Sequence, residues 1–238
     1  MTTKLTASMV LKQLKKYGNK NHAVQASRFI KVGKEQYGAG DKFLGVRLPV
    51  LRKLAKNSAL LPLGETRKLL SNEFHEVRIA ALLILVEQFQ QGDETRKAKV
   101  VKLYLGNTRY INGWDLVDCS AHLIIGPWLM RRDKKILETL ARSTILWERR
   151  IAIMSTFHFI RQQKFTPTLK IAKLLLKDEQ DLIHKAVGWM LREVGNRGRA
   201  VEEVFLQQHY RNMPRTMLRY AIEKFPETLR KKYLNGKI

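Results

Sequence analysis

The chain has 238 residues, of which 45 are Lys or Arg and 21 are Asp or Glu, so its formal net charge is +24 at pH 7. With 45% apolar and 28% charged residues, it has the composition of a globular protein rather than of a disordered one. The longest uncharged runs, residues 80–86 and 123–130, are far below the roughly 18 residues that a membrane span needs, which excludes a transmembrane protein.

Apolar residues recur at the helical spacing of three and four residues from Leu5 onward, and strong runs follow at residues 79–86, 171–175 and 218–225. We place the Pro and Gly residues, including Gly64 and the pair Gly126-Pro127, between the helices as breaks. Alternating apolar stretches, which are typical of strands, are nearly absent. The sequence therefore predicts an all-α fold of about a dozen short helices.

Three segments of the chain look alike, because each has a basic residue followed by an apolar helical run. When they are aligned on that residue, equivalent positions recur every 34 to 36 residues. These positions are Arg78, Trp114, Arg150, Lys185 and Arg219. Such a period is typical of an α-solenoid, in which one helix of each pair is outside and its partner lines a concave surface. We expect one domain over residues 1–238 with about six helical pairs, although any helical-hairpin protein can show such a period by chance.

The excess of positive charge predicts an anionic partner, because self-repulsion of this size is costly without one. Nucleic acid is the first candidate, a membrane surface the second, and solubility alone the third. The single cysteine, Cys119, excludes an internal disulfide framework and a Cys-based zinc site, and it favours a reducing compartment. We expect a cytoplasmic protein, in a bacterium one of the cytoplasm or nucleoid.

Metal and cofactor motifs are missing from the sequence. The six histidines contain no pair three or four residues apart, and neither glycine-rich phosphate-binding pattern occurs. Cys119 has no base placed beside it by any motif, which disfavours cysteine nucleophile chemistry. We therefore expect no metal, no nucleotide and no other cofactor.

The segment 112–119 is the most informative one for chemistry. Asn112-Gly113 ends the preceding helix, and Trp114 and Asp118 are four residues apart, so they share one face of the next helix. An acid among apolar neighbours must be paired or have a use, because burying it alone costs several kcal/mol. Asp115 points elsewhere and suits a cap or dipole partner at the helix start. For Asp118, a structural ion pair with a neighbouring repeat is the alternative to catalysis.

The repeat period brings further residues to that face. Trp189 lies four residues beyond Lys185, as Asp118 lies four beyond Trp114, so the period predicts one stripe holding Trp114, Asp118, Arg150 and Trp189. Indole faces attract C–H edges and cations, a carboxylate stabilises positive charge, and arginine holds phosphate. The set is typical of a site for a cationic or electron-poor sugar-like group, and ordinary core packing of the tryptophans is the alternative.

From about residue 5 to residue 230 the chain resembles the AlkD-type DNA alkylation-repair glycosylases, which are built from HEAT-like helical repeats. The segments that carry the resemblance are FLGVRLPVLRKL (43–54), WDLVD (114–118), LWERRIAI (146–153) and KAVGWMLRE (185–193). The resemblance implies that Trp114, Asp118, Arg150 and Trp189 form the active site. One departure is Gly113, where the family often has an aromatic residue, and it bears on substrate preference.

The resemblance implies hydrolysis of the N-glycosidic bond of N3- or N7-alkylated purines in duplex DNA, by a monomer and without deep base flipping. Asp118 would stabilise the oxocarbenium-like transition state and orient the attacking water. The repeat period adds Arg78, Lys185 and Arg219, and the first segment adds Arg47, as residues that contact DNA on a concave basic surface. The alternatives are a non-enzymatic solenoid that recognises distorted or branched DNA and, third, an RNA-binding or adaptor solenoid.

Overall fold

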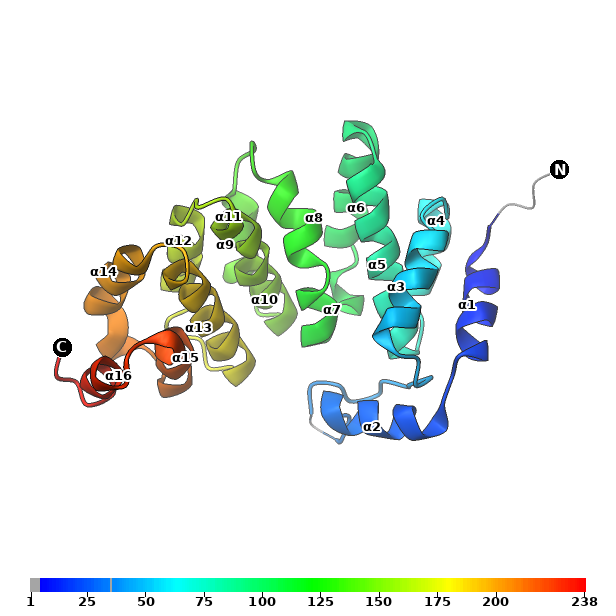
Figure 1. Ribbon diagram of the computed structural model, residues 1–238. Coiled ribbons are helices and arrows are strands. Elements are labelled where there is room, and N and C mark those ends of the chain that lie inside the picture. Colours follow the sequence, from blue (N-terminus) through cyan, green and yellow to red (C-terminus); the bar gives the residue numbers. More distant parts are fainter. Residues whose placement is uncertain (1–4, 35) are drawn as a thin grey trace. The chain divides into compact units, whose positions relative to one another are not determined.

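The computed structural model describes residues 5–34 and 36–238, and the regular elements within these residues are helices (Figure 1). The extended pairing found in this part of the chain is one isolated bridge between Lys42 and Phe74. The predicted all-α fold class is therefore confirmed. Among the described residues no helix is both long enough and apolar enough to cross a membrane.

The chain divides into two compact units, a first that ends at Ser120 and a second that covers Ala121–Ile238, and each is described by itself. The first unit contains α1 (Ala7–Lys16), α2 (Lys20–Ile30), α3 (Leu48–Asn57), α4 (Leu63–Leu70), α5 (His75–Gln91), α6 (Glu94–Leu105), η1 (Thr108–Tyr110) and α7 (Trp114–Asp118). The single domain over residues 1–238 stays a prediction, as does the concave basic surface.

The second unit begins with α8 (Ala121–Trp128), α9 (Lys135–Ala141), α10 (Leu146–Ser155), α11 (Phe157–Arg161), α12 (Thr166–Leu174) and α13 (Asp181–Gly195). It continues with α14 (Arg199–His209), η2 (Tyr210–Asn212), α15 (Arg215–Ala221), η3 (Ile222–Lys224) and α16 (Glu227–Leu234). Several of these helices pack as neighbouring pairs, among them α9 with α10, α12 with α13, and α13 with α15.

The core of the first unit is built around α5. Its side chains are buried on nearly every side, and Val77, Ala80, Leu82 and Leu85 are fully enclosed. A helix that is apolar all round must be surrounded, and α3, α4, α6 and α7 pack against it. The apolar run at 79–86 thus marks the centre of this unit.

The core of the second unit is built around α13, which packs against α10, α12, α14 and α15. Gly188 allows the close approach of α15, since a Cβ atom there would lie 2.4 Å from the carbonyl oxygen of Met217. Gly188 and Trp189 are neighbours, so this contact also sets the depth of the helix that carries Trp189.

The helices of the second unit keep the register of the repeat. Arg150, Lys185 and Arg219 are each the fifth residue of their helix, because α10, α13 and α15 begin at 146, 181 and 215. In the first unit the register drifts: Arg78 is the fourth residue of α5, and Trp114 is the first of α7.

Four of the predicted helix breaks lie inside helices. The second residues of α3, α4 and α12 are Pro49, Gly64 and Pro167, and Gly126-Pro127 lies near the end of α8. A proline near a helix end removes one backbone hydrogen bond without stopping the helix, and Leu129 N–H still donates to the carbonyl oxygen of Ile125. The other prolines do stand at helix starts, as N-cap or first-turn residues.

Candidate active site

The segment predicted to carry the chemistry forms a short helix, α7, in the first unit. Gly113 is its N-cap residue, and the fully buried Leu116 and Val117 fix it against the core. Trp114 and Asp118 stand at its two ends and are half-buried. Both line the same pocket, which Asp115 and Cys119 also line.

This pocket lies within the first unit and has a volume of about 370 Å³. Its walls come from α2, α3, α5, α7 and the segment before α3, and they are mostly apolar, with Phe29, Phe43 and Leu48 among them. Asp118 contributes a carboxyl group, as do Asp115 and Glu76, and His75 lines the pocket as well. Cys119 also lines it, but burial raises the pKa of the thiol, so the thiolate form is disfavoured at neutral pH. The volume falls within the range of small-molecule sites.

The indole of Trp114 is fixed by the segment that follows α2. Its Nε1–H donates a hydrogen bond of 3.1 Å to Tyr37 Oη. The ring of Phe29 meets it edge-on, with ring centroids 5.4 Å apart, and Phe29 itself is 68% exposed. No sequence signal pointed to these two partners, because they lie far from Trp114 along the chain.

Asp115 supports the start of α7, as expected, but the prediction that it points elsewhere is wrong, because it lines the same pocket as Trp114 and Asp118. Its Oδ1 accepts the backbone N–H of Leu116 at 3.0 Å, in the first turn where a negative charge favours the helix dipole. Its Oδ2 accepts a second hydrogen bond of 2.7 Å, from Nε2 of His75 in α5. The sequence analysis missed this second contact, which joins two helices.

Arg150 and Trp189 belong to the second unit. Arg150 lies on α10 with 5% of its surface exposed, and its Nη1 donates to the carbonyl oxygen of Leu182 in α13. Trp189 lies on α13 itself and is half-buried. The structure thus places the four predicted residues as one pair on α7 and another on α10 and α13, and their meeting in one stripe stays a prediction.

Trp189 has neighbours that the sequence analysis did not single out. Its Nε1–H donates to Glu193 Oε1 at 3.3 Å, and Glu193 Oε2 accepts a 2.6 Å hydrogen bond from Arg197. The ring centroids of Phe157 and the indole are 6.3 Å apart. The guanidinium carbon of Arg197 lies over the Phe157 ring, 5.9 Å from its centroid. Spacing offered a signal here, because Trp189, Glu193 and Arg197 are four residues apart along α13 and its end.

Three of the four predicted DNA-contacting residues present their charge toward solvent. Arg219 and Arg47 are exposed, and Arg47 contacts His22 with 2.7 Å between Nη2 and Nε2. Lys185 is 41% exposed at its side chain and forms an ion pair with Asp181.

Arg78 differs from the other three, since only 5% of its surface is exposed. Its Nη2 donates to Asp41 Oδ1 at 2.7 Å, and its Nη1 donates to the carbonyl oxygens of Asn72 and Glu73. These bonds favour a structural role for Arg78 over the predicted DNA contact.

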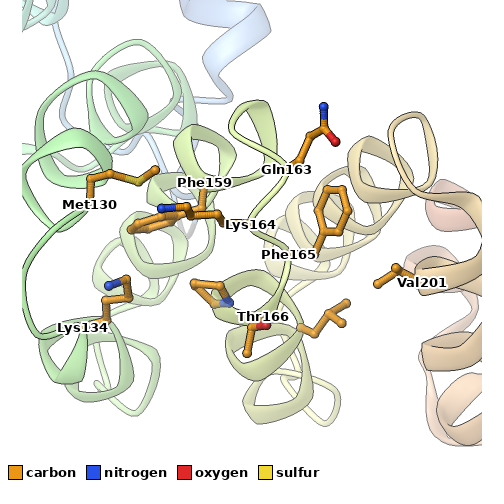
Figure 2. A pocket seen from close by; sticks show the side chains of 10 residues that line it. Met130, Lys134, Phe159, Gln163, Lys164, Phe165, Thr166 and Val201 are labelled. Atoms are coloured by element: carbon orange, nitrogen blue, oxygen red, sulfur yellow. The ribbon is translucent and has the colours of Figure 1, made fainter.

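The second unit has pockets of its own on other elements. Figure 2 shows one of about 480 Å³, with Phe159 and Lys164 close together at one side and Phe165 and Val201 at the other. It holds none of the predicted site residues. Within the described residues no group of three or more His, Cys, Asp or Glu side chains is arranged to hold a metal ion.

Comparisons with known proteins give one family. The sequence model described as "DNA alkylation repair enzyme" matches residues 10–225. A solved structure described as "Predicted DNA alkylation repair enzyme from Enterococcus faecalis" is similar with a TM-score of 0.68 and 18% identity, over 88% of this chain and 97% of that one. At this identity the likeness is one of fold. None of the curated proteins matches the chain significantly.

Proposed function

The chain belongs to the DNA alkylation repair enzyme family, and from this premise we propose that it is a glycosylase that hydrolyses the N-glycosidic bond of N3- or N7-alkylated purines in duplex DNA. The resemblance read from the sequence is thereby confirmed at the level of the family. Repair of alkylated DNA accounts for the excess of positive charge, because a DNA-binding protein neutralises phosphates with Lys and Arg.

The observation that carries the proposal is the placement of Trp114 and Asp118 on one short helix, in the wall of one pocket. An aromatic face and a carboxyl group are then within reach of the same ligand. The indole is held by Tyr37, and the helix by buried Leu116 and Val117, so both groups are pre-organised before DNA binds.

The proposed chemistry needs one carboxylate and no general acid. An N3- or N7-alkylated purine is cationic, so it leaves as a neutral base, and positive charge develops on the deoxyribose as in other glycosyl transfers. Asp118 stabilises that charge and orients the attacking water. A charge placed where the transition state develops the opposite one contributes about 3–4 kcal/mol, or 10²–10³ in rate.

The resemblance also assigns a role in the reaction to Arg150 and Trp189, which belong to the second unit. Trp189 contacts the deoxyribose through its indole face, and Glu193 holds the indole nitrogen. Arg150 is as buried as Arg78 and donates to the carbonyl oxygen of Leu182, so its proposed hold on the phosphate beside the lesion requires that DNA binding uncover its guanidinium. Arg47, Lys185 and Arg219 bind the DNA backbone.

We propose that the base stays in or near the helix stack, as the resemblance implies. The pocket beside Asp118 favours a second outcome, in which an extruded base enters its 370 Å³. Substrates with a bulky N7 adduct separate the two outcomes. Release of such a base at a rate close to that of 7-methylguanine supports excision without flipping, and exclusion of it supports capture in the pocket.

The test of the function is release of 7-methylguanine from methylated duplex DNA, with unmethylated duplex as the control. We expect release from the methylated DNA alone. Tight binding to branched or distorted DNA without release of a base would contradict the proposal and establish the non-enzymatic alternative. Binding of either kind should weaken with salt, with a slope of about −0.9 for each neutralised phosphate.

A further inference from the structure

The orientation of α7 depends on contacts outside the helix. A helix of five residues has little backbone hydrogen bonding of its own, so its neighbours fix its direction. Since Trp114 and Asp118 stand at its ends, a small rotation of α7 moves both. The side chain of Asp115, between them, makes the contact that ties α7 to α5.

That contact belongs to a buried chain of four charged groups. Nε2 of His75 donates to Asp115 Oδ2 at 2.7 Å, and Nδ1 of the same ring donates to Asp41 Oδ2 at 2.7 Å. Asp41 Oδ1 then accepts from Nη2 of Arg78 at 2.7 Å. The side chains of His75, Asp41 and Arg78 are 2%, 5% and 6% exposed, so water competes little for these bonds.

The geometry requires the imidazolium form of His75. Ionised carboxylates accept hydrogen bonds and donate none, so both ring nitrogens must carry a proton to make two such bonds. Two carboxylates, one guanidinium and one imidazolium also sum to zero charge, which is the state that burial tolerates best. The ring of Phe43 stacks on the imidazole, with centroids 5.1 Å apart and an angle of 25°, and holds its plane.

Gly113 makes room for this arrangement. A Cβ atom at position 113 would lie 2.9 Å from Asp115 Oδ1 and 3.1 Å from Cε1 of His75, both too close without movement. Gly113, which stands where the family often has an aromatic residue, therefore leaves the space in which His75 approaches Asp115.

We propose that His75 is a positioning residue, which holds α7 through Asp115 and so keeps Asp118 and Trp114 in the orientation needed for base excision. This inference rests on the proposed function and deepens it. His75 also lines the pocket that Trp114 and Asp118 line, but we assign it no contact with the reacting atoms. It acts through its hydrogen bond to Asp115.

The arrangement has a consequence for the dependence on pH. Burial and the charge of Arg78 on α5 act to lower the pKa of His75. The hydrogen bonds to Asp115 on α7 and to Asp41 in the segment before α3 outweigh them and raise that pKa to about 9. α2 and α3 present apolar side chains to the same pocket, such as Ala26 and Leu51. Glu76 on α5 and Asp118 on α7 line it as well, and Glu76 accepts the backbone N–H groups of Leu44 and Gly45. Loss of the proton leaves one of the two carboxylates without its donor, so α7 loosens above about pH 9.

The experiment compares His75→Phe with wild type and with the control His209→Gln, which lies on α14 of the second unit. We expect the single-turnover rate of 7-methylguanine release to fall about 10- to 100-fold in His75→Phe, because misplacement of a catalytic group by about 1 Å has effects of this size. DNA affinity should stay within about twofold, since the phosphate contacts are elsewhere. A rate within about twofold of wild type would overturn the proposal.

Asp115→Asn is the second variant, should His75→Phe fail to fold. It removes one charge partner of His75, so the alkaline loss of activity that wild type shows near pH 9 should move to lower pH. A profile that is flat through pH 9 in wild type, or that does not move in the variant, contradicts the proposal.

A readout independent of activity separates this inference from the proposed function. The NMR signal of the Trp114 indole N–H, which is bonded to Tyr37, reports the orientation of α7. We expect it to shift in His75→Phe and, in wild type, to titrate with a midpoint near pH 9. If wild type releases no base, the proposed function fails, and this signal still decides the inference: an unchanged signal overturns it.

Discussion

Two buried carboxyl groups, Asp41 in the first unit and Glu202 in the second, are treated in opposite ways, although the second unit also pairs a buried carboxylate, Asp178, with Arg149. In the first unit the side chain of Asp41 is 5% exposed and accepts hydrogen bonds from His75 and Arg78. In the second unit Glu202 is 1% exposed, and its Oε1 has no hydrogen-bond partner among the described residues. Both carboxyl groups are largely removed from water, and they differ in the hydrogen-bond donors that reach them.

The difference shows in the pKa values. Burial acts to raise the pKa of Asp41, but the hydrogen bond from His75 and the charge of Arg78 bring it below its ordinary value. Burial raises the pKa of Glu202 to about 8, because the charges of Arg199 and Arg192 do not offset it. The first unit therefore uses buried ions to hold the helix that carries Asp118, whereas the second unit buries a carboxylic acid in neutral form.

The largest loss in the free energy of unfolding should come from removing Arg78, the charged partner of Asp41. Arg78→Met leaves Asp41 buried with His75 as its remaining charged donor, and removal of one partner of a buried ion pair costs about 3–5 kcal/mol. We expect urea unfolding to report a loss of that size in the free energy of unfolding. Arg219→Met, an exposed position of the same repeat period, should change it by less than about 0.5 kcal/mol. Equal effects in the two variants would contradict a structural role for Arg78.

Replacement of the unpaired acid, Glu202, should raise the free energy of unfolding rather than lower it. The folded-state pKa of Glu202 lies above its unfolded value of 4.5, so its contribution to stability is fully present below pH 4.5 and is lost as pH rises through about 8. Glu202→Gln removes this loss and should stabilise the protein by about 4–5 kcal/mol at pH 8.5 and by little at pH 4.5. Thermal unfolding at both pH values measures it, with Glu203→Gln, which is far more exposed, as the control. Destabilisation at both would show that Glu202 is ionised and paired.

The pH dependence of the first unit sharpens the contrast. The folded pKa of His75, about 9, lies above its unfolded value of 6.5, so its stabilisation is complete below pH 6.5 and is lost as pH rises through about 9. The full contribution is about 3 kcal/mol. His75→Phe should therefore differ most from wild type in unfolding free energy near pH 6 and least above pH 9. A constant difference across that range would show that the ring is neutral in the folded protein.

The smallest effect concerns the charges that stay in solvent. Arg219→Gln should weaken duplex DNA binding modestly and lower the slope of log affinity against log salt by about 0.9, the value for one phosphate contact. Fluorescence anisotropy over a salt series measures it. An unchanged slope would remove Arg219 from the DNA interface, and a fall in unfolding free energy would place it with Arg78 instead.

The sequence predicted the parts of the fold that depend on local pattern. Apolar spacing identified α5, α12 and α15, because a helix that buries one face must repeat at that spacing. The period of 34 to 36 residues found the common fifth position of α10, α13 and α15. The break predicted at Gly126-Pro127 was wrong, because a proline that ends a helix and one that lies in its last turn look alike in sequence.

The sequence predicted only part of the candidate site, because the contacts that hold it join residues far apart in the chain. The segment Trp114–Asp118 stood out because a carboxyl group among apolar residues is unusual. His75 is 34 residues from Asp41 and 40 residues from Asp115 along the chain. No local sequence pattern marks a histidine that bonds to two such distant acids. The same lack of a local signal hid the burial of Arg78, whose neighbours in sequence resemble those of the exposed Arg219.

The most direct test of the account is a single-turnover measurement of 7-methylguanine release by Asp118→Asn, with DNA affinity measured in parallel. Asp133→Asn, an exposed acid in the second unit, is the matched control. We predict that the rate falls about 10²–10³-fold in Asp118→Asn while the affinity changes little, because the carboxylate acts on the transition state and not on binding. A rate within about twofold of wild type would contradict the assignment of the reaction to Asp118.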